Sequence, residues 1–289
     1  MAAPGEPIQH ISDTAFWAAA FRARETERPD ALFRDPFAAR LAAERGPDVI
    51  QSFPNGAQNE WAWISRTVLF DRLIHEEIAS GVDLVLNLAA GLDARPYRLE
   101  LPGGLRWIEA DLPPVLEYKA NLLKADRPRC HLERVAADLG DDAARRALFS
   151  RVAGECRKGL VITEGLLIYL QPAAVETLAS DLAAMPGFKV WVTDLVSPAL
   201  LRILQKHIGG PLARAGAPLR FAPDQGPLFF ERFGWSVADA NSMLKTAARL
   251  GRLRLWLRLL AMLPDTGGRN PRQPWSGVCR LRRAAGGAG

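Results

Sequence analysis

Residues 83–98, DLVLNLAAGLDARPYR, restrict the fold of this chain more than any other segment. The part at 83–88 is a short apolar run rich in branched side chains, which is typical of a buried parallel strand. Three small residues follow at 89–91, and a turn of such residues lets a ligand approach the backbone closely. An acid and two arginines come next, and Pro96 fits only the first turn of a helix or a loop. The segment favours the first ligand-binding loop of a nucleotide-type α/β sheet over a plain strand-to-loop connection.

After residue 82 the chain alternates between strand-like and helix-like segments. The predicted strands cover 83–88, 105–110, 132–136, 159–163 and 188–194, and the helices between them cover 113–125, 141–153 and 172–185. Such alternation predicts a mostly parallel, doubly wound α/β sheet. Beyond it we expect a helix at 198–208, a loop at 209–227, a strand at 229–235, a long helix at 237–263 and a final strand at 275–283.

Apolar residues at helical spacing predict three helices before the sheet, at 12–28, 35–45 and 60–80. No internal repeat or low-complexity linker divides the 289 residues. We therefore expect a single domain over 1–289 with a helical N-terminal extension.

Composition and charge argue against several classes of protein. The formal net charge is +5, but most basic residues alternate with acids, so we expect no nucleic-acid partner. Three widely spaced cysteines, Cys130, Cys156 and Cys279, predict neither a disulfide framework nor a metal site. The N-terminus lacks the features of a signal peptide, and no run of about 18 apolar residues could span a membrane. These features favour a cytoplasmic protein.

An acid follows the second predicted strand, in WIEADLPPVLEYK at 107–119. Asp111 lies 20 residues after Gly91, the offset at which a carboxylate usually accepts hydrogen bonds from a ribose. Glu109 is a rival for this role because it lies on the same face of the strand. Alternatively, Asp111 caps the helix that Pro113 opens.

Two further segments place polar residues after strands. In VAADLG at 135–140, Asp138 can accept from the amino group of an adenine while Leu139 packs on the ring, although an aspartate before a glycine turn is common. In VITEGLLIYL at 161–170, Glu164 follows a strand at the edge where open α/β sheets bind ligands. A carboxylate among apolar residues needs a cation, either a ligand ammonium or an arginine of the chain.

In this order, the segments resemble the leucine carboxyl methyltransferase-like branch of the S-adenosylmethionine-dependent methyltransferases. The segment at 11–38 is similar to the helical cap of the bacterial members, and 63–74 to the segment that contributes an arginine to the site. Ala94 and Ala110 depart from the hydroxyl and branched residues that other members often have there. The resemblance implies a class I, Rossmann-like fold with a seven-stranded sheet. The cap would cover 1–80, the cofactor-binding half 81–194, and a late insertion with the final strands 195–289.

The resemblance also implies site roles for a bound S-adenosyl-L-methionine. Arg66 would bind the methionine carboxylate, Ala89 and Gly91 would let the backbone approach the methionine, Asp111 would hold the ribose, Asp138 and Leu139 the adenine, and Glu164 would lie near the ammonium group. We expect Arg95 and Arg98 to pair with buried acids such as Glu164 or to line the chamber for methyl transfer. The absence of a G-x-G-x-x-G motif argues against the alternative of a nicotinamide-dependent oxidoreductase.

The implied reaction is O-methylation of a carboxylate or hydroxyl of a small molecule, and a protein C-terminal carboxylate is the alternative acceptor. A carboxylate acceptor is already ionised at neutral pH, whereas a hydroxyl would need a base. Tyr169 and His207 are the candidate bases.

We expect the N-terminal helices and residues 195–265 to build the acceptor pocket. Its candidate walls are Phe16, Trp17, Arg22, Phe229, Phe230 and Trp235, against the alternative that the aromatic residues are ordinary core. Residues 244–263 have the pattern of a basic amphipathic helix, which we expect to pack its leucines over the pocket rather than lie on a membrane surface. Either arrangement would suit an apolar or polyketide-like acceptor.

Overall fold

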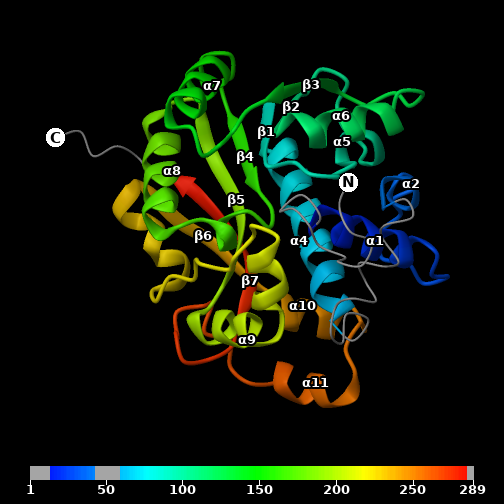
Figure 1. Ribbon diagram of the computed structural model, residues 1–289, viewed down its shortest axis with the longest axis vertical. Coiled ribbons are helices and arrows are strands. Elements are labelled where there is room, and N and C mark those ends of the chain that lie inside the picture. The colour runs from blue at the N-terminus through cyan, green and yellow to red at the C-terminus, as the bar shows by residue number, and fades with distance from the viewer. Residues whose placement is uncertain (1–13, 43–58, 285–289) are drawn as a thin grey trace.

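A seven-stranded sheet lies at the centre of the computed structural model, which describes residues 14–42 and 59–284 (Figure 1). The strands are β1 (Leu84–Leu88), β2 (Arg106–Asp111), β3 (His131–Ala136), β4 (Gly159–Thr163), β5 (Phe188–Val196), β6 (Trp235–Ser242) and β7 (Ser276–Arg283). Their spatial order is β3-β2-β1-β4-β5-β7-β6. Strands β1 to β5 run parallel, whereas β7 pairs antiparallel with both β5 and β6. The predicted doubly wound, mostly parallel sheet is confirmed.

Helices cover both faces of this sheet, and β1 is buried at every position. Leu84 and Leu86 pack in a core with residues of α7 (Asp142–Gly154) and α8 (Pro172–Ala184). Val85 packs in a second core with residues of α4 (Glu60–Ala79) on the other face. Because alternate side chains of a strand point to opposite faces, a continuous apolar run is what a strand between two layers requires.

The chain order reverses between β1 and β4, which are neighbours in the sheet although β2 and β3 lie between them in the sequence. The connections after β1 and β4 therefore diverge at the carboxyl ends of the strands, where open α/β sheets bind ligands. The connection after β1 contains the single-turn helix α5 (Arg95–Arg98), with Pro96 in its first turn as predicted. The connection after β2 leads directly into α6 (Pro113–Leu122), and that after β4 contains the short 3₁₀ helix η3 (Leu167–Tyr169).

The N-terminal helices α1 (Thr14–Thr26) and α2 (Ala38–Ala42) pack on each other, and α1 also packs on α4. The helices predicted at 12–28 and 60–80 are confirmed over the described residues. The helix predicted at 35–45 begins only at Ala38, because residues 35–37 form a turn, and it continues to Ala42. Residues 43–45 lie outside the described residues. Every helix in the described ranges is too short or too polar to cross a bilayer.

The structure after residue 197 differs from the prediction in several places. Helix α9 (Pro198–Arg214) continues through Gly209, Gly210 and Pro211, where we expected a loop. Ile208 and Leu212 of α9 are buried in a cluster with residues of α1, so packing outweighs the poor helix propensity of glycine and proline. The strand predicted at 229–235 is instead the 3₁₀ helix η4 (Gly226–Phe233).

The prediction of one long helix at 237–263 is wrong. Residues up to Ser242 belong to β6, which pairs with β7. The Ser242 hydroxyl then accepts from the Lys245 N–H and caps α10 (Met243–Arg249), and a turn at Gly251 precedes α11 (Leu255–Ala261). Residues 237–242 form a strand because they pair with a strand that is distant in the sequence, and the local apolar periodicity does not reveal such pairing.

The expectation that this segment packs its leucines over the pocket is also wrong. Most large apolar side chains of α11 are exposed. Only Ala261, which is buried, and Leu257, which is partly buried, pack in the small cluster beneath the helix.

Candidate functional site

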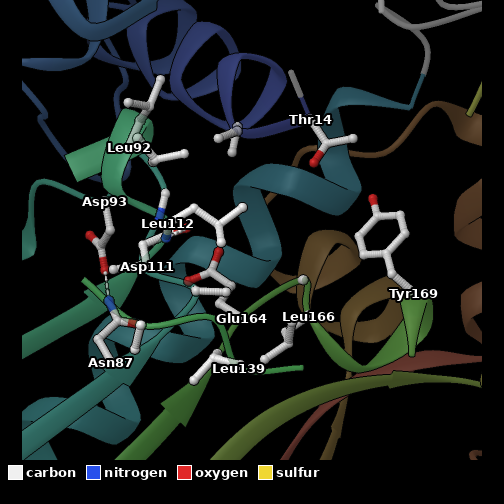
Figure 2. A pocket seen from close by; sticks show the side chains of 18 of the residues that line it. Thr14, Asn87, Leu92, Asp93, Asp111, Leu112, Leu139, Glu164, Leu166 and Tyr169 are labelled. Atoms are coloured by element: carbon white, nitrogen blue, oxygen red, sulfur yellow. Dashed lines mark hydrogen bonds between the residues drawn. The ribbon is translucent and has the colours of Figure 1, made fainter. Parts of the chain in front are cut away.

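A cavity of about 400 Å³ opens at the carboxyl ends of β1, β2 and β4 (Figure 2). All seven residues expected to bind a cofactor line it: Arg66, Ala89, Gly91, Asp111, Asp138, Leu139 and Glu164. These residues come from α4, from the last residue of β2 and from the connections after β1, β3 and β4, and the sheet edge brings them together. Helix α1 contributes Thr14, Ala15, Ala18 and Arg22 to the wall.

The turn after β1 has left-handed backbone at two positions, a conformation that favours glycine. Ala89 and Gly91 both have left-handed backbone, with φ of 52° and 50°. A Cβ on Gly91 would lie 3.2 Å from the Cβ of Ala15, so α1 packs closely against this turn. Ala89, Ala90 and Gly91 all line the cavity, and their small size would let a ligand approach the backbone.

Asp111 anchors this turn from β2. Its Oδ2 accepts a 2.6 Å hydrogen bond from the Gly91 N–H, and its Oδ1 accepts one of 2.7 Å from the Leu112 N–H. Burial raises the pKa of Asp111, while the two backbone N–H groups lower it in part. Leu112, not Asp111, occupies the cap position of α6, so Asp111 is not a helix cap.

Glu109, the rival of Asp111, has a structural role. It is fully buried, with Lys119 Nζ 2.6 Å from Oε1 and Arg134 Nε 3.1 Å from Oε2. Glu109 is absent from the cavity wall, whereas Asp111 is part of it. The structure thus separates two acids that the sequence leaves as alternatives.

Asp138 and Leu139 line the cavity beyond the end of β3. The Gly140 N–H donates a 2.8 Å hydrogen bond to Asp138 Oδ1, which is the local turn that the sequence left open as the alternative. One carboxylate can make this turn and still present its second oxygen to a ligand.

Glu164 lies between two arginines. Arg95 Nη1 donates to its Oε2 at 2.7 Å, and Arg66 Nε lies 3.0 Å from its Oε1. The second contact lacks the angle of a hydrogen bond, so the buried Arg66 Nε–H has no hydrogen-bond partner among the described residues. A buried N–H without a partner is costly and fits a site that receives an acceptor from a ligand. Arg66 also stacks on Trp63, with its guanidinium carbon 4.5 Å from the ring centre.

Asp194 is a member of this group that the sequence analysis missed. Its Oδ2 lies 3.4 Å from Arg66 Nη1, and its Oδ1 accepts a 2.6 Å hydrogen bond from the Gly165 N–H. Burial raises the pKa of Asp194, and Arg66 opposes this. The signal was present in the sequence, because Asp194 ends the predicted strand at 188–194 and must lie at the same sheet edge.

Arg95 and Arg98 are partners of buried acids, which was one of the two expectations from the sequence. Arg95 also lines the cavity, which was the other. Asp71 of α4 accepts from Arg95 Nε at 2.6 Å and from Arg98 Nη1 at 2.7 Å. Burial opposes the ionisation of Asp71, but Arg98 and Arg95 outweigh it and hold its pKa below the usual range. Arg95 also binds Asp93 at 2.9 Å and joins this network to Glu164.

Tyr169, a candidate base, lines the cavity on η3. Figure 2 shows its hydroxyl directed toward Thr14. Burial raises the pKa of Tyr169, and its hydrogen bond with Thr14 opposes this. His207, the other candidate, is exposed on α9 and absent from the cavity wall.

Most of the expected pocket walls are ordinary core. Phe16 and Trp17 are buried in clusters beneath α1, and Phe229, Phe230 and Trp235 belong to the main core. No described residue of 195–265 lines the cavity. The prediction that this segment helps to build the pocket is therefore wrong for this cavity. Arg22 does line it, bound to Asp35 at 2.8 Å and to the Leu92 carbonyl at 2.6 Å. The sequence analysis missed Thr14 and Trp63, which also line it.

Comparison with known proteins agrees with this geometry. Residues 15–183 match the family model of leucine carboxyl methyltransferase. The chain belongs to this family. The methyltransferase is 40% identical over 253 residues to a Streptomyces coelicolor protein named for S-adenosyl-L-methionine-dependent methyltransferase activity, covering 83% of this chain and 87% of the relative. A Streptomyces avermitilis relative with the same kind of name is 33% identical over 254 residues, with the same two coverages.

Two crystal structures share the fold of this methyltransferase. One is a duf574 family protein from Streptomyces avermitilis, with a TM-score of 0.56 at 13% identity, covering 93% of this chain and 97% of that one. The other is described as a methyltransferase from Thermobifida fusca, with a TM-score of 0.54 at 16% identity and 96% coverage of both chains. The predicted family, fold and enzyme class are confirmed, and the predicted cofactor is the one named for the relatives.

Proposed function

We propose that this methyltransferase transfers the methyl group of S-adenosyl-L-methionine to an oxygen of a small molecule, a carboxylate or a hydroxyl, in the cytoplasm. The observation that carries the proposal is that all seven residues expected at a cofactor site line one cavity. The names of the relatives support the same cofactor.

The chemistry of the cavity wall fits the parts of this cofactor. Arg66 would hold the methionine carboxylate, because its buried Nε–H lacks a hydrogen-bond partner and a guanidinium binds carboxylates well. Glu164 would lie near the ammonium group. Asp111 would accept from the ribose hydroxyls, and Asp138 and Leu139 would hold the adenine. S-adenosyl-L-methionine supplies a methyl group on a sulfonium, which is already a good leaving group.

The residues of the chain then have to align the acceptor oxygen and exclude water. The wall near α1 supplies small and apolar groups for this, with Ala18, Trp63 and Leu170 among them. Tyr169 stays protonated at neutral pH because burial raises its pKa, so it would donate a hydrogen bond to the acceptor.

Among the described residues, the wall offers no ready base for an acceptor that must lose a proton. No histidine of the described residues lines the cavity, and Glu164 is paired with arginines. This favours a carboxylate acceptor, which needs no base.

Calorimetric titration with S-adenosylhomocysteine, followed by a methyl-donor consumption screen, tests the proposal. The screen would compare carboxylic acids, phenols and polyketide-like compounds, and we expect turnover with carboxylic acids first. Tight NAD(H) binding by a folded protein that does not bind S-adenosylhomocysteine would overturn the proposed cofactor. Turnover confined to a peptide C-terminus would overturn the small-molecule acceptor.

A further inference from the structure

Helix α11 and the two residues that follow it carry an exposed apolar surface, here called the α11 face: Leu255, Trp256, Leu259, Leu260, Met262 and Leu263. These are six of the seven large apolar side chains that are exposed in the described ranges, and the seventh is Ile203 of α9. Four of them, Leu255, Trp256, Leu259 and Met262, are between 58% and 79% exposed. Clustered exposed apolar groups usually mark an interaction site, whereas scattered ones do not.

The α11 face is presented by an anchored helix. Ala261 and Leu253 are buried with Ala247 of α10, and Trp61 of α4 packs against the same cluster. Figure 1 shows α11 at the edge of the molecule, away from the central sheet. The helix is therefore fixed on one side while its large side chains point away from the protein.

The charge around the α11 face is of one sign. No acid occurs between Asp239 and Asp265, while this stretch contains Lys245, Arg249, Arg252, Arg254 and Arg258. Arg252 is turned inward and binds Glu25 and Asp30, each at 2.7 Å. Asp265 is engaged as well, because it accepts hydrogen bonds from Trp275 and Gly267.

Three arginines remain beside the apolar side chains. Arg249, Arg254 and Arg258 are exposed, and none has an ion-pair partner among the residues described. The hydrogen bonds of Arg249 and Arg258 are to neutral groups, such as the 3.2 Å bond from Arg258 Nε to the Leu253 carbonyl. The partner of this surface must therefore offer both an apolar interior and negative charge.

We propose that the α11 face docks reversibly on a membrane surface that contains anionic lipids. The leucines, Met262 and Trp256 would enter the headgroup region, where tryptophan is favoured, and the arginines would contact lipid phosphates. A second copy of the chain fits less well, because the stretch between Asp239 and Asp265 has no acid to meet the arginines of a partner copy. This inference does not depend on the acceptor of the methyl group.

Co-sedimentation of the full chain with vesicles tests the proposal. We expect binding to vesicles of phosphatidylcholine with phosphatidylglycerol, weak binding to phosphatidylcholine alone, and loss of binding as salt rises. Replacing two leucines with the uncharged pair Leu255→Gln and Leu259→Gln should lower the affinity at least about 100-fold, because the burial of each leucine contributes roughly tenfold or more. The pair Arg254→Gln and Arg258→Gln should lower it about fivefold per arginine.

Matched controls keep the outcome interpretable. Ile203→Gln removes the exposed apolar side chain outside the α11 face, and Lys124→Gln with Arg127→Gln removes two exposed cations in the loop after α6. Both controls should bind vesicles like the wild type, and circular dichroism should show every variant folded. Equal binding by the α11 variants, or no binding of the wild type to anionic vesicles, would overturn the proposal. So would a wild-type dimer that the leucine substitutions convert to a monomer, because the face would then belong to a second copy.

Discussion

The backbone N–H of Gly91 donates a 2.6 Å hydrogen bond to the carboxylate of Asp111, which lies on the neighbouring strand 20 residues later. This bond ties the turn after β1 to the end of β2 at the point where both line the cavity. The turn and the proposed ribose acceptor therefore form one unit. A change in either residue should alter cofactor binding through the other.

We expect Asp111→Ala to weaken the binding of S-adenosylhomocysteine by at least about tenfold, equivalent to about 1.4 kcal/mol. The substitution removes the proposed acceptor for the ribose hydroxyls and also the bond that holds the Gly91 turn. Titration calorimetry measures the affinity. Glu231→Ala, at an exposed acid of η4, is the control and should bind like the wild type. Wild-type affinity in a folded Asp111→Ala variant would contradict the assigned role.

Gly91→Ala should destabilise the protein by about 1–2 kcal/mol and weaken cofactor binding. Gly91 has a φ of 50°, and a Cβ there would meet the Cβ of Ala15 at 3.2 Å. Urea unfolding measures the first effect and calorimetry the second. Gly103→Ala is the matched control, because nothing lies within 4 Å of its Cβ position and its φ is not in the left-handed region. The same loss in both variants would mean that the Gly91 conformation has no special role.

Tyr169→Phe separates a hydrogen-bond donor from a base. We expect it to lower kcat/KM for the acceptor only about fivefold, the effect of losing one hydrogen bond of about 1 kcal/mol. Loss of an essential base would instead cost about 100-fold or more. Because burial raises the pKa of Tyr169, a Tyr169 base would also make the wild-type rate climb with pH above neutrality. A rate independent of pH in that range, with S-adenosylhomocysteine affinity unchanged in the variant, would support the donor role.

The sequence was sufficient for β1 and β4, because these parallel strands are buried at every position and consist almost entirely of apolar residues. It was also sufficient to place the cavity-lining residues at one edge, since parallel strands end together. The roles of Glu109 and Asp111 could not be distinguished in this way. Their roles depend on Lys119, which lies 10 residues away on α6 and is turned toward Glu109.

The region after 197 was harder to predict for a different physical reason. The segment 237–242 is a strand because β7 pairs with it, and that partner lies about forty residues later in the sequence. The apolar periodicity of 244–263 indicates helical structure, but the chain forms two short helices there, α10 and α11, instead of the single long helix predicted. It cannot indicate whether the apolar side of α11 meets the protein or solvent, because a leucine has the same helical spacing in both cases.

Asp71→Asn should lower the free energy of unfolding by about 3 kcal/mol, the usual cost of breaking a buried ion pair. The substitution removes the carboxylate charge that faces Arg95 and Arg98, both of which are buried at the side chain. The pKa of Asp71 is lower in the folded protein than in the unfolded chain. Its contribution is therefore complete above the unfolded pKa, about 3.9, and is lost as the pH falls through the folded value. We expect the difference between variant and wild type in urea unfolding to be constant near neutrality and to shrink in acid.

Glu176→Gln, which breaks the exposed pair with Arg232, is the control and should cost at most about 1 kcal/mol. A difference between Asp71→Asn and wild type that grew as the pH fell would contradict the sign of this pKa shift.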